Sequence, residues 1–147
     1  MTAERPPCIF VKRLGGLFPA NNEATLALAG VDGKCVVRIT AATRNQRRRS
    51  LYWIVVGIVA PILNDAHGGD WTDAELHAHV LERLGYVTES KPFPDGSTVK
   101  RLQSTSDKAM NEADRTIFTN KAFDAFSRWT GVPVDVLIAE GRTQEAA

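Results

Sequence analysis

The segment of residues 44–63, RNQRRRSLYWIVVGIVAPIL, constrains the fold of this chain more than any other segment does. Its second part, residues 51–63, carries no charge and is apolar nearly all the way round, which is typical of a helix that its neighbours bury on most sides. These 13 residues fall short of the roughly 20 that span a bilayer, so we expect a core helix. The spacing of Leu51, Val55, Ile58 and Ile62 predicts its main core face.

Four arginines stand where this helix should begin: Arg44, Arg47, Arg48 and Arg49. A helix N-terminus is unfavourable for cations, because its unpaired N–H groups and its dipole already make it positive. The guanidinium groups also repel one another unless an anion lies among them. Phosphate is the natural candidate, since arginine forks and helix N-termini both bind it. The alternative is a solvated helix end whose cations pair with acidic residues from elsewhere in the chain.

The basic residues are unevenly distributed, although the net charge is only +1. Residues 34–64 contain six basic residues and no acidic one, and the rest of the chain holds 12 basic and 17 acidic residues. The two further cations of the basic segment are Lys34 and Arg38, and a later predicted hairpin carries Lys100 and Arg101. A basic patch on a mildly acidic body indicates a specific anionic partner and argues against indiscriminate binding to polyanions.

The remaining patterns predict an α+β fold: a small antiparallel sheet and a hairpin packed around a long buried central helix and a C-terminal helix. Strands are expected at residues 8–14, 34–40, 86–90 and 97–102. Helices are expected from Asn21 or Asn22 to about residue 30, over 73–84 after Thr72, over 112–130 after Asn111, and over 134–140. Pro61 should end or kink the central helix, and residues 64–70 have the composition of a loop.

Length and composition favour one domain, residues 1–141, followed by a disordered tail at 142–147. Cys8 and Cys35 lack metal-ligand or redox spacing, and the first residues contain no signal-peptide pattern. We therefore expect both thiols to be reduced and buried, in a cytoplasmic protein without a membrane segment.

Histidine and aspartate residues near the central loop raise the alternative of a metal-dependent nuclease that uses Asp65, His67 and Asp70. The spacing argues against a metal site, because His77 and His79 are two residues apart and point to different sides of a helix. No motif of a nucleophilic or phosphate-loop enzyme occurs either. We therefore expect no catalytic residues, no metal and no cofactor.

Two aromatic residues are candidate stacking platforms for nucleic-acid bases. Tyr52 follows the arginines by a few residues, and Trp71 follows a loop of small and polar residues. Single strands are commonly held by aromatic rings beside basic grooves. Trp53 lies within the apolar helix, and core packing is its expected role. The hydroxyl side chains of residues 104–106 are expected to face backbone or solvent at the end of a strand.

The order of several motifs resembles phage protein families. Gly16-x-Phe18-Pro19-Ala20-x-x-Glu23, then Gly33, Arg44-Asn45 and Tyr52-Trp53 resemble a family of uncharacterised phage proteins. His67-Gly68, Trp71, Asp73-Ala74-Glu75 and Gln103-Ser104-Thr105-Ser106 resemble the NinB family, the lambda Orf-like recombination proteins. Members of that family are homodimers that bind single-stranded DNA and assist phage recombination without cleaving it. In one respect this chain departs from the pattern, because an arginine run replaces the family's aromatic-and-glutamine start to the central helix.

These observations together predict a non-catalytic protein that binds single-stranded DNA during phage recombination or replication, in the cytoplasm of a bacterial host. The resemblance implies a homodimer and leaves open a host single-strand-binding or recombination protein as a further partner. The expected contact residues are Arg44, Arg47, Arg48, Arg49, Lys34, Arg38, Tyr52, Trp71, Lys100 and Arg101. Besides the nuclease, a protein-interaction module that binds an acidic segment of a host protein remains an alternative, because such a segment is also a flexible polyanion.

Overall fold

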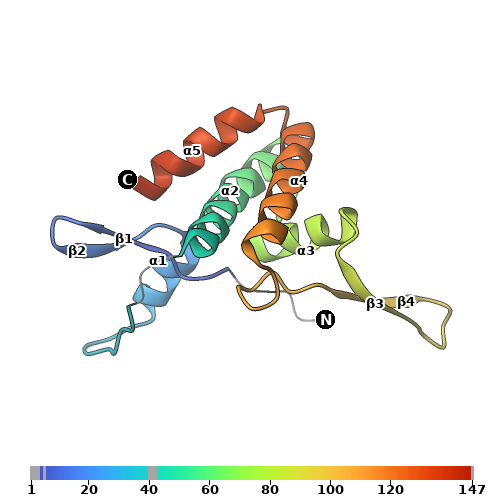
Figure 1. Ribbon diagram of the computed structural model, residues 1–147, viewed down its shortest axis with the longest axis horizontal. Coiled ribbons are helices and arrows are strands. Elements are labelled where there is room, and N and C mark those ends of the chain that lie inside the picture. Colours follow the sequence, from blue (N-terminus) through green and yellow to red (C-terminus); the bar gives the residue numbers. More distant parts are fainter. Residues whose placement is uncertain (1–3, 5, 40–42, 147) are drawn as a thin grey trace.

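The computed structural model describes residues 4, 6–39 and 43–146, and it confirms an α+β fold with a long central helix and a C-terminal helix (Figure 1). The elements in chain order are β1 (Phe10–Arg13), β2 (Gly16–Pro19), α1 (Asn22–Ala29), α2 (Arg44–His67), α3 (Asp73–Arg83), β3 (Val87–Pro92), β4 (Thr98–Leu102), α4 (Glu112–Thr130) and α5 (Val134–Ala146).

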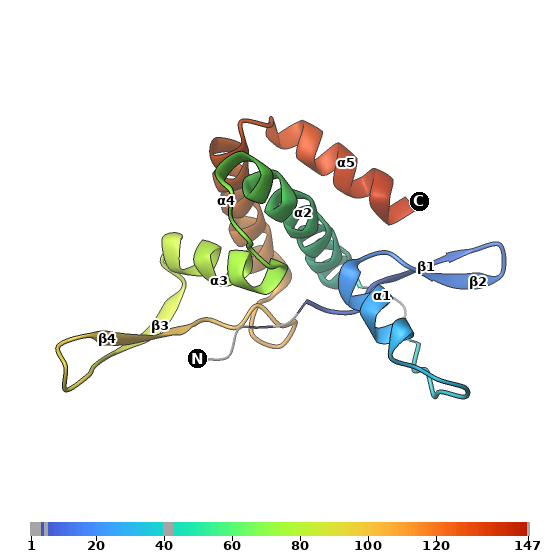
Figure 2. The ribbon, with the colours of Figure 1, turned by 180° about the vertical axis from the view of Figure 1, so that it is seen from behind.

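Helix α2 forms the centre of the protein, with α3, α4 and α5 packed around it (Figures 1 and 2). Tyr52, Trp53, Val55, Val56 and Val59 are almost completely buried in this helical core. By length and hydropathy α2 would also suffice to cross a membrane, but the core helix of a soluble protein meets the same criterion. Its buried side chains are accounted for by its packing against the other helices.

The predicted core face of α2 was correct only in part. Val55 is fully buried, whereas Leu51, Ile58 and Ile62 are half-buried. A single stripe of four residues describes a helix that packs against one partner, but α2 contacts three helices, so its burial extends around most of its circumference. The complete set of buried α2 residues is Tyr52, Trp53, Ile54, Val55, Val56, Val59, Ala60 and Leu63.

The helices begin and end at residues that satisfy their terminal backbone groups. Asn21, Thr72 and Asn111 are N-caps of α1, α3 and α4, as the sequence predicted, and each side chain accepts a hydrogen bond from a backbone N–H three residues on. Helix α2 ends later than predicted, because it continues for six residues beyond Pro61 to His67. Gly68, in the left-handed conformation with a φ of 69°, then ends it.

Two antiparallel ribbons project from opposite ends of the helical body (Figures 1 and 2). The β3–β4 hairpin was predicted and is present, although β3 begins at Val87. The other ribbon pairs β1 with β2 over Phe10↔Pro19 to Arg13↔Gly16. The sequence predicted the first of these strands and not the second, which follows directly after the hairpin turn at Leu14 and Gly15.

The strand predicted at residues 34–40 was wrong for residues 34–39, which form no strand, and Thr40 lies outside the described residues. The alternating apolar side chains of residues 34–39 do not produce a strand, because β1 pairs with β2 and not with this segment. Cys8 and Cys35 are free thiols, but both are exposed, so the prediction that they are buried was also wrong.

Helix α5 extends through residues 142–146, which the sequence had assigned to a disordered tail. Gly141 allows this helix to lie close to α2. A Cβ atom at position 141 would stand 2.9 Å from Val55 Cγ2 and 3.0 Å from Leu51 Cδ1. The C-terminal helix is therefore fixed by packing on α2 rather than by its own sequence pattern.

Candidate nucleic-acid interface

Three of the four predicted arginines lie on one side of the start of α2. Arg44, Arg47 and Arg48 have the spacing i, i+3, i+4, which places them on a common helix face. The Arg44 side chain is 83% exposed and its Nη1 lies 3.8 Å from Glu112 Oε1, a distance at which an exposed pair contributes little. Arg47 is exposed and Arg48 is half-buried, and neither has an ion pair among the described residues.

The helix start that carries these arginines is well formed despite their charge. Thr43 and Gln46 make a capping box: the Gln46 N–H donates to Thr43 Oγ1 at 3.1 Å, and the Thr43 N–H donates to Gln46 Oε1 at 2.7 Å. The first turn contains no acidic residue. The arginines therefore stand on a rigid element whose positive end is not compensated within its own turn.

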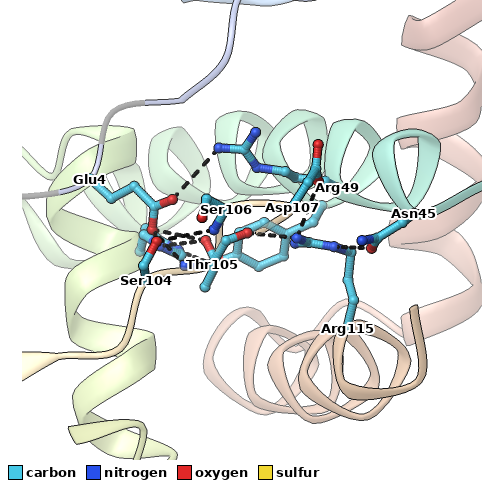
Figure 3. A network of polar contacts seen from close by, with 10 residues as sticks. Glu4, Asn45, Arg49, Ser104, Thr105, Ser106, Asp107 and Arg115 are labelled. Carbon is cyan, nitrogen blue, oxygen red and sulfur yellow. Dashed lines mark hydrogen bonds and ion pairs between the residues drawn. The ribbon is translucent and has the colours of Figure 1, made fainter. Parts of the chain in front are cut away.

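Arg49 faces the interior instead, where it contacts Glu4. Its Nη2 lies 3.6 Å from Glu4 Oε1, and its side chain is only 19% exposed. Glu4 Oε2 in turn accepts hydrogen bonds from the Thr105 N–H at 3.1 Å and from the Thr105 hydroxyl at 2.9 Å (Figure 3). Arg49 therefore belongs to a buried polar network and only partly to the exposed cluster, which corrects its predicted role as one of four equivalent phosphate contacts.

Arg115 of α4 anchors the other half of this network (Figure 3). It is almost completely buried, and it donates from Nε to Asn45 Oδ1 and from Nη2 to the Thr105 carbonyl oxygen at 2.6 Å. Its Nη2 also lies 3.4 Å from Asp107 Oδ1. Because Asn45 lies in the first turn of α2, this network holds the base of the arginine face against α4.

His77 and Tyr52 extend the network into the core. The Tyr52 hydroxyl donates to His77 Nδ1 at 2.6 Å, and His77 Nε2 donates to Glu4 Oε2 at 3.2 Å, which requires the neutral tautomer with its proton on Nε2. Burial lowers the pKa of His77, and burial followed by the charge of Glu4 raises the pKa of Tyr52. Burial alone would raise the pKa of Glu4, but hydrogen bonds from His77 and Thr105 lower it to about 2.

A cleft of about 460 Å³ lies beside the start of α2. Gln46, Arg49 and Ser50 of α2 line one side, and Arg38 lines it from the exposed loop before the helix. Phe10 and Leu17 of the β1–β2 ribbon form an apolar part of the wall. Of the four predicted arginines, only Arg49 lines this cleft together with Arg38, which lies in a loop and not in a strand.

The other predicted cations are dispersed. Lys34 is exposed in the loop that follows α1. Lys100 and Arg101 lie on the β3–β4 ribbon, away from the β1–β2 side, and each contacts an acid: Lys100 Nζ lies 3.0 Å from Glu82 Oε1, and Arg101 Nε lies 3.7 Å from Glu89 Oε2. The predicted track from the arginines to Lys100 and Arg101 is therefore not continuous within one protomer.

The aromatic candidates differ in their exposure. Tyr52 is buried, so the prediction that it is a stacking face was wrong. Its hydroxyl points into the core, where it donates a hydrogen bond to His77 Nδ1. Trp53 is buried in the core, as predicted. Trp71 is 38% exposed, and Asn64 holds its backbone through hydrogen bonds of 2.7 Å and 3.1 Å. Only Trp71 of the two candidates presents a ring to a ligand.

The residues of the nuclease alternative, Asp65, His67 and Asp70, are all exposed around the end of α2. Among the described residues, no group of three or more histidine, cysteine, aspartate or glutamate side chains is arranged to hold a metal ion.

Sequence reasoning missed Glu4, Arg115 and the buried role of Thr105. Arg115 offered one indication, because it lies three residues before Phe118 and seven before Ala122, on the apolar face of α4. A charged residue on such a face needs buried partners. Glu4 had no comparable pattern, since its partners are 73 and 101 residues away in the sequence.

Comparison of the chain with models of known protein families, with curated proteins and with solved structures gave no match.

Proposed function

We propose that this protein binds single-stranded DNA without cleaving it, by accommodating the phosphate backbone on the face of α2 that carries Arg44, Arg47 and Arg48. The observation that carries the proposal is the position of Arg47 and Arg48, which stand at a positive helix end without an acidic partner within ion-pair distance among the described residues. Burial raises the pKa of Glu145, and the charges of Arg142 and then Arg47 offset this only in part, so Glu145 interacts with Arg47 from beyond ion-pair distance. A phosphate backbone supplies the missing negative charge.

The cleft beside Arg38 extends this surface. Its charged side chains are Arg38, Arg49 and one carboxylate, Asp107, and its apolar side presents Phe10 and Leu17, a combination that suits a strand with charged phosphates and flat bases. Trp71 lines a different cleft, so we do not place it on the same strand path within one protomer. The contact residues of the proposal are Arg38, Arg44, Arg47, Arg48 and, at the margin, Arg49.

We further propose that the protein acts as a homodimer, as the resemblance to the NinB family implies. Ten large apolar side chains between residues 10 and 39 are exposed, a concentration that is unusual for a soluble monomer. They are Phe10, Leu14, Leu17, Phe18, Leu26, Leu28, Val31, Val36, Val37 and Ile39. Association of two copies through the members of this set that line neither cleft, Leu14, Phe18, Leu28, Val31 and Val36, would cover these five side chains and leave the clefts open. Such a pair would bring two arginine faces together, in a protein of the host cytoplasm.

The proposal is tested by titrating the protein with labelled single-stranded, double-stranded and overhang DNA, with and without magnesium or manganese. We expect binding that favours the single strand, without cleavage of any substrate. Metal-dependent cleavage that disappears in Asp70→Ala or His67→Ala would support the nuclease instead. Equal affinity for an acidic peptide of matched charge would support the protein-interaction module.

A further inference from the structure

A second cleft, of about 780 Å³, lies where α1, the middle of α2 and the start of α3 come together. Its lining shares no residue with the cleft beside Arg38 and Arg49. That cleft has two arginines and one aspartate in its lining, whereas the charged side chains of this one are both acidic, so it is unsuited to a phosphate backbone. The two clefts therefore require different ligands.

Two carboxylates line this second cleft, Glu23 from α1 and Asp73 from α3. Both are half-buried, and neither has an ion pair among the described residues. Each lies in the first turn of its helix, where the dipole offers partial compensation. That compensation is incomplete at Asp73, because burial and then the charge of Glu23 raise its pKa. A cation between the two carboxylates would remove this conflict.

An indole ring forms another part of the lining. The side chain of Asn64 donates a hydrogen bond to the Trp71 carbonyl oxygen and accepts one from the Trp71 N–H. The Trp71 ring lies against Gly69, since a Cβ atom at position 69 would stand 3.2 Å from Trp71 Cδ1. A positioned and partly exposed indole that lines the same cleft as two carboxylates is a favourable surface for a flat cation, because the ring face is negative.

The wall of the cleft also contains a buried donor without an acceptor. Trp53 is 1% exposed and lines the cleft, and its Nε1–H has no hydrogen-bond partner among the described residues. Buried donors are nearly always paired, so a ligand that carries an acceptor oxygen near its cation would complete this site. A peptide has such an oxygen at every carbonyl group.

We propose that this cleft binds an arginine side chain that a protein partner presents in an extended peptide segment. The guanidinium group fits the lining better than an ammonium group does, because it bridges carboxylates through paired hydrogen bonds and stacks on an indole face. Glu23 and Asp73 bind the charge, Trp71 supports the plane of the group, and a neighbouring peptide carbonyl accepts from Trp53. This site is independent of the nucleic-acid surface.

The test uses the 147-residue chain without DNA and two short peptides, acetyl-Gly-Arg-Gly-amide and the same peptide with neutral citrulline in place of arginine. Binding is followed through the three indole N–H signals in proton–nitrogen spectra. We expect the arginine peptide to shift the Trp71 and Trp53 signals saturably and the citrulline peptide to bind at least tenfold more weakly. The Trp129 signal, outside the cleft, reports that the protein remains folded.

Two variants and one control distinguish the site from non-specific attraction. Asp73→Asn and Glu23→Gln should each weaken binding of the arginine peptide by about tenfold, the effect of losing one charge-assisted hydrogen bond. Asp65→Asn, which removes an exposed carboxylate outside the cleft, should leave it unchanged. Equal binding of both peptides, or wild-type affinity in both cleft variants, would overturn the proposal. So would equal affinity for free arginine amide, which lacks the flanking peptide carbonyls.

Discussion

The Tyr52 hydroxyl donates a hydrogen bond of 2.6 Å to His77 Nδ1 in the buried centre of the protein and thereby joins α2 to α3. Because the other ring nitrogen of His77, Nε2, donates a hydrogen bond to Glu4, this pair also connects the helical core with the N-terminal segment. The rigid placement of the arginine face depends on the same network, since Asn45 and Arg49 at the start of α2 belong to it.

Replacing Tyr52 by phenylalanine should lower the free energy of unfolding by about 1–3 kcal/mol, because a buried acceptor on His77 loses its donor. Chemical denaturation measures this change. Tyr86→Phe is the matched control, since Tyr86 is half-buried and its hydroxyl has no hydrogen bond among those described. Equal losses in the two variants would mean that the Tyr52–His77 bond contributes nothing specific.

Stability should depend on pH through Glu4. Its pKa is lowered from 4.5 to about 2 in the folded protein, so its contribution is present above pH 4.5 and is lost as the pH falls toward 2. Glu4→Gln should therefore be less stable than the wild type at neutral pH, and the difference should shrink across this window. Denaturation midpoints of both proteins from pH 7 to pH 2 test the expectation, and a difference that stays constant contradicts it.

Replacing Gly141 by alanine should destabilise the protein by about 1–3 kcal/mol, because the added methyl group would press on Val55 and Leu51. The loss should exceed the gain in helix propensity of about 1 kcal/mol. Ala139→Gly, at an exposed position of the same helix, measures that propensity separately. An increase in melting temperature for Gly141→Ala would show that α5 does not lie close to α2.

Features of this fold that depend on local sequence were predictable. The N-caps at Thr72 and Asn111 and the hairpin of β3 and β4 follow from short-range hydrogen bonding and turn chemistry, and they are where the sequence indicated. The segment 34–39 was not predictable in this way, because alternation forms a strand only if a partner strand is available.

The candidate site was predictable to a similar extent. The sequence identified the arginine cluster, but it did not separate Arg49, which pairs with Glu4, from the exposed Arg47 and the half-buried Arg48, which have no ion pair among the described residues. That difference arises from Glu4 and Arg115, which come from distant parts of the chain. The stacking role of Tyr52 failed for the same reason, since its partner His77 lies on another helix.

Assembly should depend on the exposed apolar residues of the N-terminal region. Light scattering at micromolar concentration should give the mass of a dimer for the wild type and of a monomer for Leu28→Glu combined with Val36→Glu, two exposed positions outside both clefts. Ile117→Glu changes an exposed apolar residue of α4 and should leave the dimer intact. A wild-type monomer at every concentration would remove the dimer from the proposal.

The salt dependence of single-stranded DNA binding tests the central claim most directly. If about four phosphates per protomer are neutralised, affinity should fall with a log–log slope near −3, on the order of fifty-fold between 50 and 200 mM salt. Arg47→Ala combined with Arg48→Ala should flatten this slope by roughly one to one and a half units. The melting temperature should hold or rise, because the helix end loses unfavourable charge. Arg83→Ala combined with Arg128→Ala, which removes two exposed arginines elsewhere, should change neither the slope nor the affinity substantially. If the Arg47/Arg48 variant binds DNA as the wild type does and melts earlier, the arginines stabilise the fold and the binding site lies elsewhere.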